Sequence, residues 1–380
     1  MLLTSNSFID PLAPPIAGVR HPFVPSTNMK AVIAGAGACF ADAEIAQAAI
    51  DLTELPTYEI CVLYIGTASY DINLYKERQT CQFHKMGCHV KSLNIANSSL
   101  TFEEMKRLVE GATIILVSGG NTLFAMERWR LLGLDLLIKI AVLRGVIMAG
   151  GSAGAICWFD GGHSDSMDPD TYRIPMLAKY GSKNGVPPNR SRFYGAPVDD
   201  HNSVDEREWD YIRVSGLGIF PGLICPHYDR IQSNGVPRLV DFDQMMKRHS
   251  SELGIGIDHN AALLISGSDF RVLSIAGQSG SVPDSLGDTF FEESSGLPGV
   301  WIKYVDVDGR VLSKVVPSSG KVEELMQRIQ DPAFISLDNK VGIAKKENPG
   351  PDDGQLEPLE PKLFPEWIYD VNFCYSPGSP

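Results

Sequence analysis

The chain has 380 residues, of which 44% are hydrophobic and 21% are charged, a globular balance that excludes wholesale disorder, collagen and coiled coil. Its length allows a sizeable core and favours about two to three domains. Lys and Arg number 33 against 46 Asp and Glu, and because the net charge is −13 the chain lacks the broad positive field that nucleic-acid binding needs.

The first 28 residues carry repeated Pro and Gly and show no hydrophobic periodicity, so we expect an irregular leader over 1–28. Its start lacks a basic segment followed by an apolar one, which argues against a secretory signal. The seven cysteines of the chain are sparse and irregularly spaced, and they do not indicate a disulfide scaffold. These features favour a cytoplasmic protein.

From residue 29 onward, short apolar runs of strand length alternate with amphipathic helical stretches. The predicted strands are 31–36, 60–66, 90–93, 113–117 and 146–149. The predicted helices are 41–52, 73–86, 101–110 and 121–132. The runs are almost continuously apolar, which is typical of strands buried on both faces. Helical crossovers between such strands predict an α/β fold with a mostly parallel sheet that is covered on both sides.

The second half of the chain is less regular. The apolar stretch at 131–151 contains three charged residues, so it favours a helix running into a buried strand over a membrane span. A polar segment at 166–210 is too long for a simple connection, and we expect an insertion near the site. Further strand-like runs follow at 216–220, 223–225, 254–257, 261–265 and 271–275. A hairpin with an Asp-Gly turn is predicted at 301–314, and a last helix at 322–330.

The end of the chain is rich in Pro, Gly and acidic residues, which predicts a flexible tail over 336–380 and leaves a main domain at 29–335. Aromatic residues near the end of the tail could pack on the domain or on a neighbouring copy. The sequence therefore leaves a homodimer open, whereas it predicts no membrane partner.

The strongest local signal is Gly150-Gly151-Ser152-Ala153-Gly154, where an apolar strand runs into a serine flanked by small residues. A serine on a sharp strand-to-helix turn projects its hydroxyl at the carboxyl edge of a sheet, and the glycines permit the strained backbone. This arrangement predicts a nucleophilic serine. The alternative is a tight turn whose small residues only pack.

A second glycine-rich turn, Ser118-Gly119-Gly120-Asn121, follows the strand predicted at 113–117. Neighbouring parallel strands end at the same edge of a sheet, so this turn can lie beside Ser152. The amides of Gly120 and Asn121 could then join the amide of Ala153 in an oxyanion hole. Asn121 also suits a helix N-cap, and the two roles are compatible.

A nucleophilic serine needs a base, and the chain has eight histidines. His227 directly follows the apolar run 222–226, which places it at the carboxyl end of a strand, where sites of α/β sheets collect. We therefore interpret His227 as the general base, with a structural histidine as the alternative. His163, eleven residues after Ser152, is the weaker competitor.

Three motifs in this order resemble the peptidase E (aspartyl dipeptidase) family of serine peptidases, a family related to the cyanophycinases. They are Ser-Gly-Gly-Asn-Thr at 118–122, Gly-Ser-Ala-Gly-Ala at 151–155 and Pro-His-Tyr at 226–228. The resemblance covers residues 29–275 and implies a three-layer αβα sandwich with a flavodoxin-like sheet, as in class I glutamine amidotransferases. It also implies the nucleophile, base and oxyanion turn given above, and release of N-terminal aspartate from small peptides without a metal or cofactor.

The same resemblance suggests further site residues. Asp165 matches the acidic position of the family and would orient His227, with Glu44 as the alternative acid. Arg238 matches the arginine of a Gly-x-x-Arg stretch after the catalytic histidine, and it would grip a substrate carboxylate. Arg230 is the alternative cation. For each of these residues, a surface charge or salt bridge is the competing interpretation.

Departures and alternatives remain. The spacing from Ser152 to His227 is 75 residues, longer than in compact family members, and the excess falls in 166–210. Three other interpretations stay open: an α/β-hydrolase esterase, a cyanophycinase-like hydrolase of β-aspartyl peptides, and an inactive homologue that binds an acidic ligand. The thiols and imidazoles at 81–89 are interpreted as chance clustering rather than a zinc site. A small acidic peptide is the expected partner.

Overall fold

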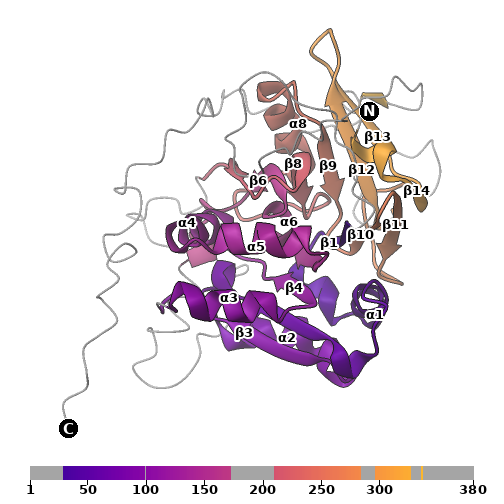
Figure 1. Cartoon of the computed structure of the whole chain (residues 1–380). Helices are drawn as coiled ribbons and strands as arrows, with labels where there is room; N and C mark the ends of the chain where they lie inside the picture. Colours follow the sequence, from indigo (N-terminus) through magenta and orange to yellow (C-terminus); the bar gives the residue numbers. More distant parts are fainter. Residues whose placement is uncertain (1–28, 99, 173–208, 284–295, 327–334, 337–380) are drawn as a thin grey trace, which may run out of the picture.

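The computed structural model describes residues 29–98, 100–172, 209–283, 296–326 and 335–336. The predicted leader, most of the 166–210 insertion and nearly all of the predicted tail lie outside these residues, as does the end of the helix predicted at 322–330. Figure 1 shows the described helices and strands, coloured along the sequence.

The first half of the described chain alternates strands and helices, and each predicted strand and helix is confirmed to within two residues at its ends. The strands are β1 (Lys30–Ala34), β2 (Cys61–Ile65), β3 (His89–Leu93), β4 (Ile114–Val117) and β5 (Ile147–Gly151). The helices are α1 (Ala43–Asp51), α2 (Asn73–Lys85), α3 (Phe102–Glu110), α4 (Thr122–Leu132) and α5 (Leu134–Leu143). Short 3-10 helices are η1 (Gly37–Ala41), η2 (Thr57–Glu59) and η3 (Thr67–Ser69).

These five strands form the parallel part of an eight-stranded sheet with the order β14-β11-β10-β1-β5-β4-β2-β3. β10 (Ala261–Ser266), β11 (Asp269–Ser274) and β14 (Ser319–Lys321) extend it beyond β1 through antiparallel pairs. Because β4 and β5 are parallel neighbours, with Val117 paired to Gly150, the turns that follow them meet at one edge of the sheet.

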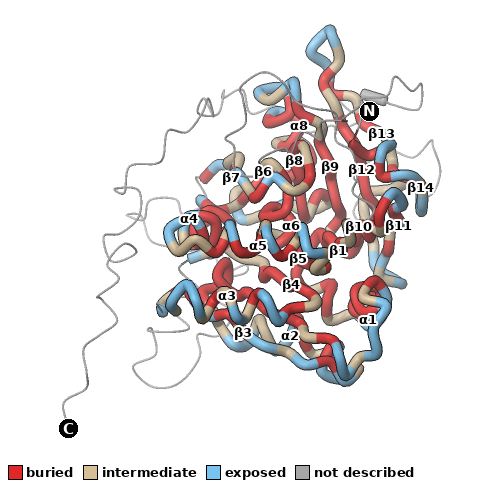
Figure 2. The backbone as a smooth tube through the Cα atoms, in the orientation of Figure 1, coloured by how far each residue is buried: buried red, intermediate tan, exposed pale blue. Residues whose placement is uncertain are grey.

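The sheet separates two layers of helices, which confirms the three-layer sandwich (Figure 1). Alternate residues of β1 show the division. Ala31 and Ile33 join the core with α3, α4 and α5, whereas Val32 and Ala34 join the core with α1 and α2. All four are fully buried, and Figure 2 shows central strands that are buried throughout. Burial on both faces explains the continuous apolar runs of the sequence.

A second sheet, which we did not predict, has the order β15-β13-β12-β9-β8-β6-β7. Its strands are β6 (Phe159–Ser164), β7 (Ile212–Ser215), β8 (Phe220–Pro226), β9 (Gly254–Ile257), β12 (Val300–Val305), β13 (Val311–Val315) and β15 (Ile335–Ser336). β6, β8 and β9 pair in parallel, and the predicted hairpin is confirmed as the antiparallel pair of β12 and β13. α8 (Arg238–Arg248) covers one face of this sheet, and α9 (Val322–Met326) packs beside β14.

One local prediction is wrong. Residues 216–219 are not a strand, because the chain turns at Gly218 with a φ of +69°, and only Phe220 of the predicted run belongs to β8. The helix after Ser152, α6 (Ala153–Ile156), ends after four residues, and the chain enters β6 at Phe159. Trp158 and Phe159 are fully buried in the core that both sheets share.

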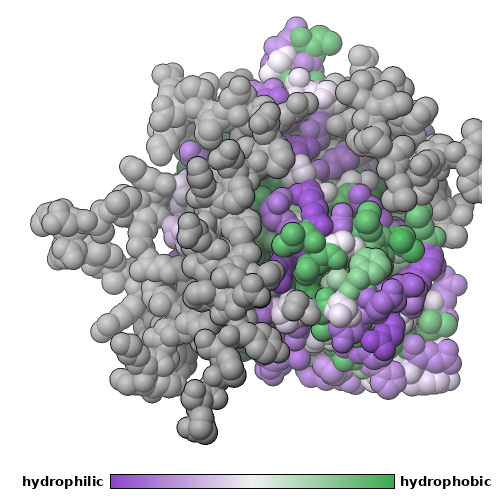
Figure 3. All heavy atoms as spheres, turned by 60° about the vertical axis from the view of Figure 1, so that its left-hand side comes forward, coloured by the Kyte–Doolittle hydropathy of each residue, from purple (hydrophilic) through white to green (hydrophobic). Residues whose placement is uncertain are grey.

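Helix α5 is apolar on its outer side as well as its inner side. Leu136, Ile140 and Leu143 lie about one turn apart and are 44%, 52% and 71% exposed. Figure 3 shows apolar side chains among hydrophilic ones on the face that this view brings forward. No helix in the described ranges is both long and apolar enough to cross a membrane.

Candidate active site

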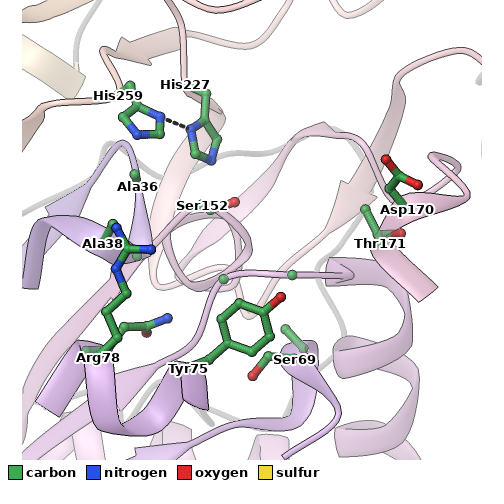
Figure 4. Close-up of a pocket in the computed structure, with 15 residues that line it drawn as sticks. Ala36, Ala38, Ser69, Tyr75, Arg78, Ser152, Asp170, Thr171, His227 and His259 are labelled. Carbon is green, nitrogen blue, oxygen red and sulfur yellow. Dashed lines mark hydrogen bonds between the residues drawn. The ribbon is translucent and has the colours of Figure 1, made fainter. Parts of the chain in front are cut away.

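A cavity of about 230 Å³ lies at the edge where β1, β4 and β5 end, next to the end of β8. Figure 4 shows Ser152 near its centre, with His227 and His259 together on one side. Arg78 and Asp170 lie to either side of Ser152 in the same view. The volume is below the roughly 300–1,000 Å³ of pockets that hold drug-sized ligands, so the cavity suits a small one.

Ser152 occupies the sharp turn that the sequence predicts between a strand and a helix. Its backbone angles, φ 58° and ψ −123°, are strained for a residue with a side chain. The flanking glycines are needed for space: a Cβ at Gly151 would lie 2.3 Å from the Ala36 carbonyl oxygen, and one at Gly154 would lie 2.2 Å from that of Val117. The close packing of this turn holds the strained serine at the cavity.

The turn after β4 lies against Ser152, as predicted. A Cβ at Gly119 would lie 3.1 Å from the Cβ of Ser152, and Gly120 has a φ of +127° with the backbone of Ala68 directly beside it. Neither the Gly120 amide nor the Ala153 amide bonds to another residue of the described chain. Both amides therefore suit an oxyanion hole.

Asn121 does not fit the oxyanion role predicted for its amide. Its N–H already donates to the carbonyl oxygen of Ala68 at 2.8 Å. Its side chain caps α4 by accepting the amide of Phe124 at 2.9 Å, and it donates to Ser166 and Thr171. The capping alternative describes this buried residue, because all of its polar groups are used within the fold.

His227 directly follows β8, at the strand end that the sequence predicts, although β8 belongs to the second sheet. Its backbone N–H donates to the carbonyl oxygen of Gly35 at 3.2 Å, which joins the ends of β8 and β1. Figure 4 shows Nδ1 turned to His259 and the other ring nitrogen on the side of Ser152. Burial, together with Arg238, His259 and Arg230, holds the pKa of His227 well below 6.5.

His259 is a site residue that the sequence analysis missed. Its Nδ1 lies 2.7 Å from Nδ1 of His227, and its backbone N–H donates to Oδ1 of Asp229 at 2.6 Å. Burial and Arg230 lower its pKa, while Asp229 opposes them. It follows the predicted strand 254–257 by two residues, so the rule that selected His227 could have found it.

Neither predicted acid is placed against His227. Oδ2 of Asp165 accepts hydrogen bonds from Arg238 at 3.1 Å and from Gln232 at 2.9 Å, because a buried guanidinium needs an anionic partner. Glu44 is exposed in the first turn of α1 and does not line the cavity. An acid would bind Nδ1 of His227, but this nitrogen is hydrogen-bonded to Nδ1 of His259 instead.

Neither predicted arginine lines the cavity. Arg238 is only 1% exposed, and its guanidinium donates to Asp165 and, at 2.6 Å, to the carbonyl oxygen of His163. Arg230 pairs with Asp229 at 3.5 Å. Both are engaged within the fold, so the expected role of Arg238 in gripping a substrate carboxylate does not match its position.

The first turns of α2 supply polar groups that we did not predict. Arg78 lines the cavity, is exposed, and makes no side-chain hydrogen bond or ion pair within the described residues. Gln79 is 5% exposed, and its Oε1 accepts no hydrogen bond from the described chain. Tyr75 points into the same space in Figure 4. This face of α2 therefore offers an available cation and a buried acceptor.

His163, the weaker candidate base, lies in the core rather than at the cavity. It is fully buried, and its Nε2 lies 2.9 Å from Oδ1 of Asp241. Burial lowers its pKa to about 4. The residues at 81–89 do not form a metal site, and no cluster suited to a metal ion occurs in the described parts of the chain.

The sequence matches peptidase family S51 over residues 32–181 and 194–273, more than half of the chain. The chain belongs to this family. The resemblance to peptidase E and the prediction of a serine-type peptidase are thereby confirmed. In this S51 peptidase, the structure brings Ser152, His227 and the Gly120 turn together at one cavity.

Three similar proteins each cover more than half of this chain. The protein named G2/mitotic-specific cyclin-1 of Trypanosoma brucei brucei is 28% identical over 306 residues, which cover 75% of this chain and 83% of that protein. The uncharacterized peptidase YgaJ of Bacillus subtilis (strain 168) is 32% identical over 202 residues, which cover 53% of this chain and 67% of that protein. The crystal structure of a peptidase from an acI-B1 Actinobacterium is 19% identical with a TM-score of 0.46, and it covers 70% of this chain and 96% of that chain.

Proposed function

We propose that this S51 peptidase hydrolyses small peptides with an N-terminal aspartate through an acyl-enzyme on Ser152. The observation that carries the proposal is the meeting of Ser152, His227 and the Gly120 turn at one small cavity. A strained serine on a tight turn with an imidazole beside it is the arrangement of an activated nucleophile.

The reaction proceeds in two halves. Ser152 Oγ attacks the scissile carbonyl carbon while His227 accepts the hydroxyl proton, and the amides of Gly120 and Ala153 bind the oxyanion that forms. His227 then gives the proton to the departing amine, which leaves the acyl-enzyme. In the second half, water attacks the ester carbonyl carbon while His227 accepts one of its protons. His227 then gives this proton to Ser152 Oγ as the bond between Oγ and the acyl group breaks, which releases free aspartate and restores Ser152.

The charges of the cavity support an acidic, zwitterionic substrate. Arg78 provides a cation for the β-carboxylate of an N-terminal aspartate. Asp170, on the opposite side of Ser152 in Figure 4, attracts the α-ammonium group. The buried Oε1 of Gln79 accepts a hydrogen bond from an N–H of the peptide. The small volume favours dipeptides over longer chains.

The alternative functions can be distinguished by the substrates that each would prefer. A cyanophycinase-like enzyme would prefer β-aspartyl dipeptides over α-linked Asp-X peptides. An esterase would prefer p-nitrophenyl esters, and an inactive homologue would hydrolyse none of these while still binding an acidic peptide. The lack of a carboxylate on His227 in the described site makes the inactive homologue the strongest of these alternatives.

The deciding experiment compares wild type with Ser152→Ala on Asp-Ala, Ala-Ala, β-aspartyl and ester substrates. We expect wild type to favour Asp-Ala. Ser152→Ala should lower kcat/KM by about 10⁴–10⁶ while the circular dichroism spectrum stays unchanged. Full activity in this variant, or no hydrolysis by wild type, would refute the proposal.

Arg78→Ala tests the specificity on its own. Because a hydrogen bond to a charged group contributes about 1.5–3 kcal/mol, KM for Asp-p-nitroanilide should rise roughly 10–100-fold. Asn-p-nitroanilide, which is nearly isosteric but uncharged, should change by less than about threefold, and Arg78→Lys should be intermediate. An equal loss on both substrates would remove Arg78 from the recognition of aspartate.

A further inference from the structure

His227 and His259 form a hydrogen-bonded pair at the wall of the cavity. Their Nδ1 atoms are 2.7 Å apart, and their rings are inclined by 42°. A ring nitrogen is either a donor or an acceptor, so one Nδ1 carries a proton and the other does not. Burial lowers the pKa of both below 6.5, so both rings are neutral at pH 7.

The position of Ser152 decides which ring donates. His227 can take the serine proton only on the nitrogen that faces Ser152, so its own proton must sit on Nδ1. This N–H then donates to Nδ1 of His259, which carries its proton on Nε2. The pair thereby fixes the tautomer that a general base needs, the task that a carboxylate performs in a Ser-His-Asp triad.

We propose that His259 is the positioning residue for the base of this peptidase, in place of a carboxylate. The inference rests on the proposed roles of Ser152 and His227. His259 supplies a lone pair but no negative charge, so the imidazolium that forms on His227 during catalysis is oriented without being neutralised. The site is therefore a serine–histidine–histidine arrangement with a weak base.

The cations around the pair lower the pKa of both rings, as burial does. Arg238 and Arg230 lower the pKa of His227, and Arg230 and Arg78 lower that of His259. Each favours neutral rings, so proton transfer from Ser152 has to work against them. The same cations would stabilise a carboxylate placed at position 259.

Two carboxylates that adjoin His259, those of Asp229 and Asp258, are engaged away from the rings. Asp229 accepts the backbone N–H of His259 at 2.6 Å. Asp258 accepts the amides of Ser281 and Gly299 at 2.8 and 2.9 Å, and burial and Asp229 raise its pKa to about 7. Neither carboxylate bonds to a ring nitrogen of the described pair. His259 is therefore the partner that sets the tautomer of His227.

Three substitutions at position 259 distinguish the orientation of the His227 ring from the effect of a negative charge beside it. His259→Gln keeps an acceptor for Nδ1–H, so kcat should stay within about tenfold of wild type. His259→Ala removes the acceptor, and kcat should fall by at least about 10²-fold. A base held in the wrong tautomer loses about 10⁴-fold in kcat, which is the upper end of the expected effect. His259→Glu adds a negative charge, and kcat should rise by about tenfold or more. Equal kcat in wild type, Gln and Ala variants would overturn the proposal, whether or not His259→Glu folds.

The pH profile gives a readout that a structural role would not move. The acid limb of the kcat/KM profile reports the pKa of the base in the free enzyme. The midpoint of this limb should therefore lie below pH 6.5 in wild type. His259→Glu should move this limb upward by about 1–3 pH units, because an adjacent anion favours the protonated ring. Arg230→Gln is the control: it removes a nearby cation but no ring contact, so it should move the limb up slightly with kcat retained. An unmoved limb in His259→Glu would contradict the inference.

A ¹⁵N spectrum of the histidine rings tests the pair without any substrate. We expect the proton of His227 on Nδ1 and that of His259 on Nε2 in the full chain at pH 7. If peptides are not hydrolysed but these tautomers are found, the proposed function fails and the pair stands. If peptides are hydrolysed but the proton of His227 sits on the nitrogen facing Ser152, the inference about His259 fails alone.

Discussion

Two arginines with the same charge occupy very different surroundings in this protein. Arg238 begins α8, where it is buried with Asp165 and the carbonyl oxygen of His163. Arg78 lies on the exposed face of α2 and lines the cavity. A buried guanidinium holds segments of the fold together, whereas an exposed one can meet a ligand.

Arg238→Met should therefore act on stability rather than on specificity. Removing one partner of a buried ion pair leaves Asp165 uncompensated, and the free energy of unfolding should fall by about 3–5 kcal/mol. Urea denaturation measures this change, and Arg78→Ala, at an exposed site, should stay within about 0.5 kcal/mol of wild type. The ratio of kcat/KM for Asp- and Asn-p-nitroanilide should not change in folded Arg238→Met. A fall in that ratio would indicate that Arg238 binds the substrate.

At the scale of elements, the turn between β5 and α6 depends on close backbone contact. Gly150, Gly151 and Gly154 each lie where a Cβ would come within 2.6 Å of a carbonyl oxygen of a neighbouring segment or of the turn itself. These contacts hold Ser152 in its strained conformation, and they explain why small residues surround it.

Gly154→Ala should strain this turn. The added Cβ would lie 2.2 Å from the carbonyl oxygen of Val117, so the backbone must shift, and we expect a loss of about 1–3 kcal/mol or more together with lower activity. Gly111→Ala is a matched control, because its φ is −84° and the added Cβ would make an ordinary 3.5 Å contact. Denaturation and peptide assays on both variants check the difference. Equal stability of the two variants would contradict the packing argument.

At the scale of the whole molecule, the site is assembled where the two sheets meet. Ser152 directly follows β5 of the first sheet, and His227 directly follows β8 of the second. Gly35, which follows β1, connects the two sheets. Its N–H donates to the carbonyl oxygen of Ala261, and its own carbonyl oxygen accepts the N–H of His227. The backbones are so close here that a Cβ at Gly35 would lie 1.9 Å from the carbonyl oxygen of Asp258. The relative position of nucleophile and base therefore depends on contact between the sheets.

The sequence predicts the local pattern well and the pairing of distant segments less well. Most of the parallel strands are readable because they are almost continuously apolar, whereas the edge strand β3 contains His, Lys and Ser. Ser152 and His227 are readable because each follows an apolar strand. The second sheet was missed because its pairing joins short strands far apart in the chain, one with a register shift between Phe159 and Gly161.

Other parts of the site were beyond sequence reasoning for a different physical reason. The pairing of Asp165 with Arg238 spans 73 residues and leaves no local signal. Arg78 resembles any exposed cation on a helix until α2 is placed beside the cavity. His259 is the exception, since its place after β9 marks it by the same rule as His227.

The central claim is that His227 activates the hydroxyl of Ser152, and covalent labelling tests it most directly. The full chain is treated with a fluorophosphonate at pH 7, and the adduct is mapped by mass spectrometry. We predict one adduct, on Ser152, absent from Ser152→Ala and formed at least about 10²-fold more slowly in His227→Gln. No adduct on Ser152, or an equal rate in His227→Gln, would contradict the account.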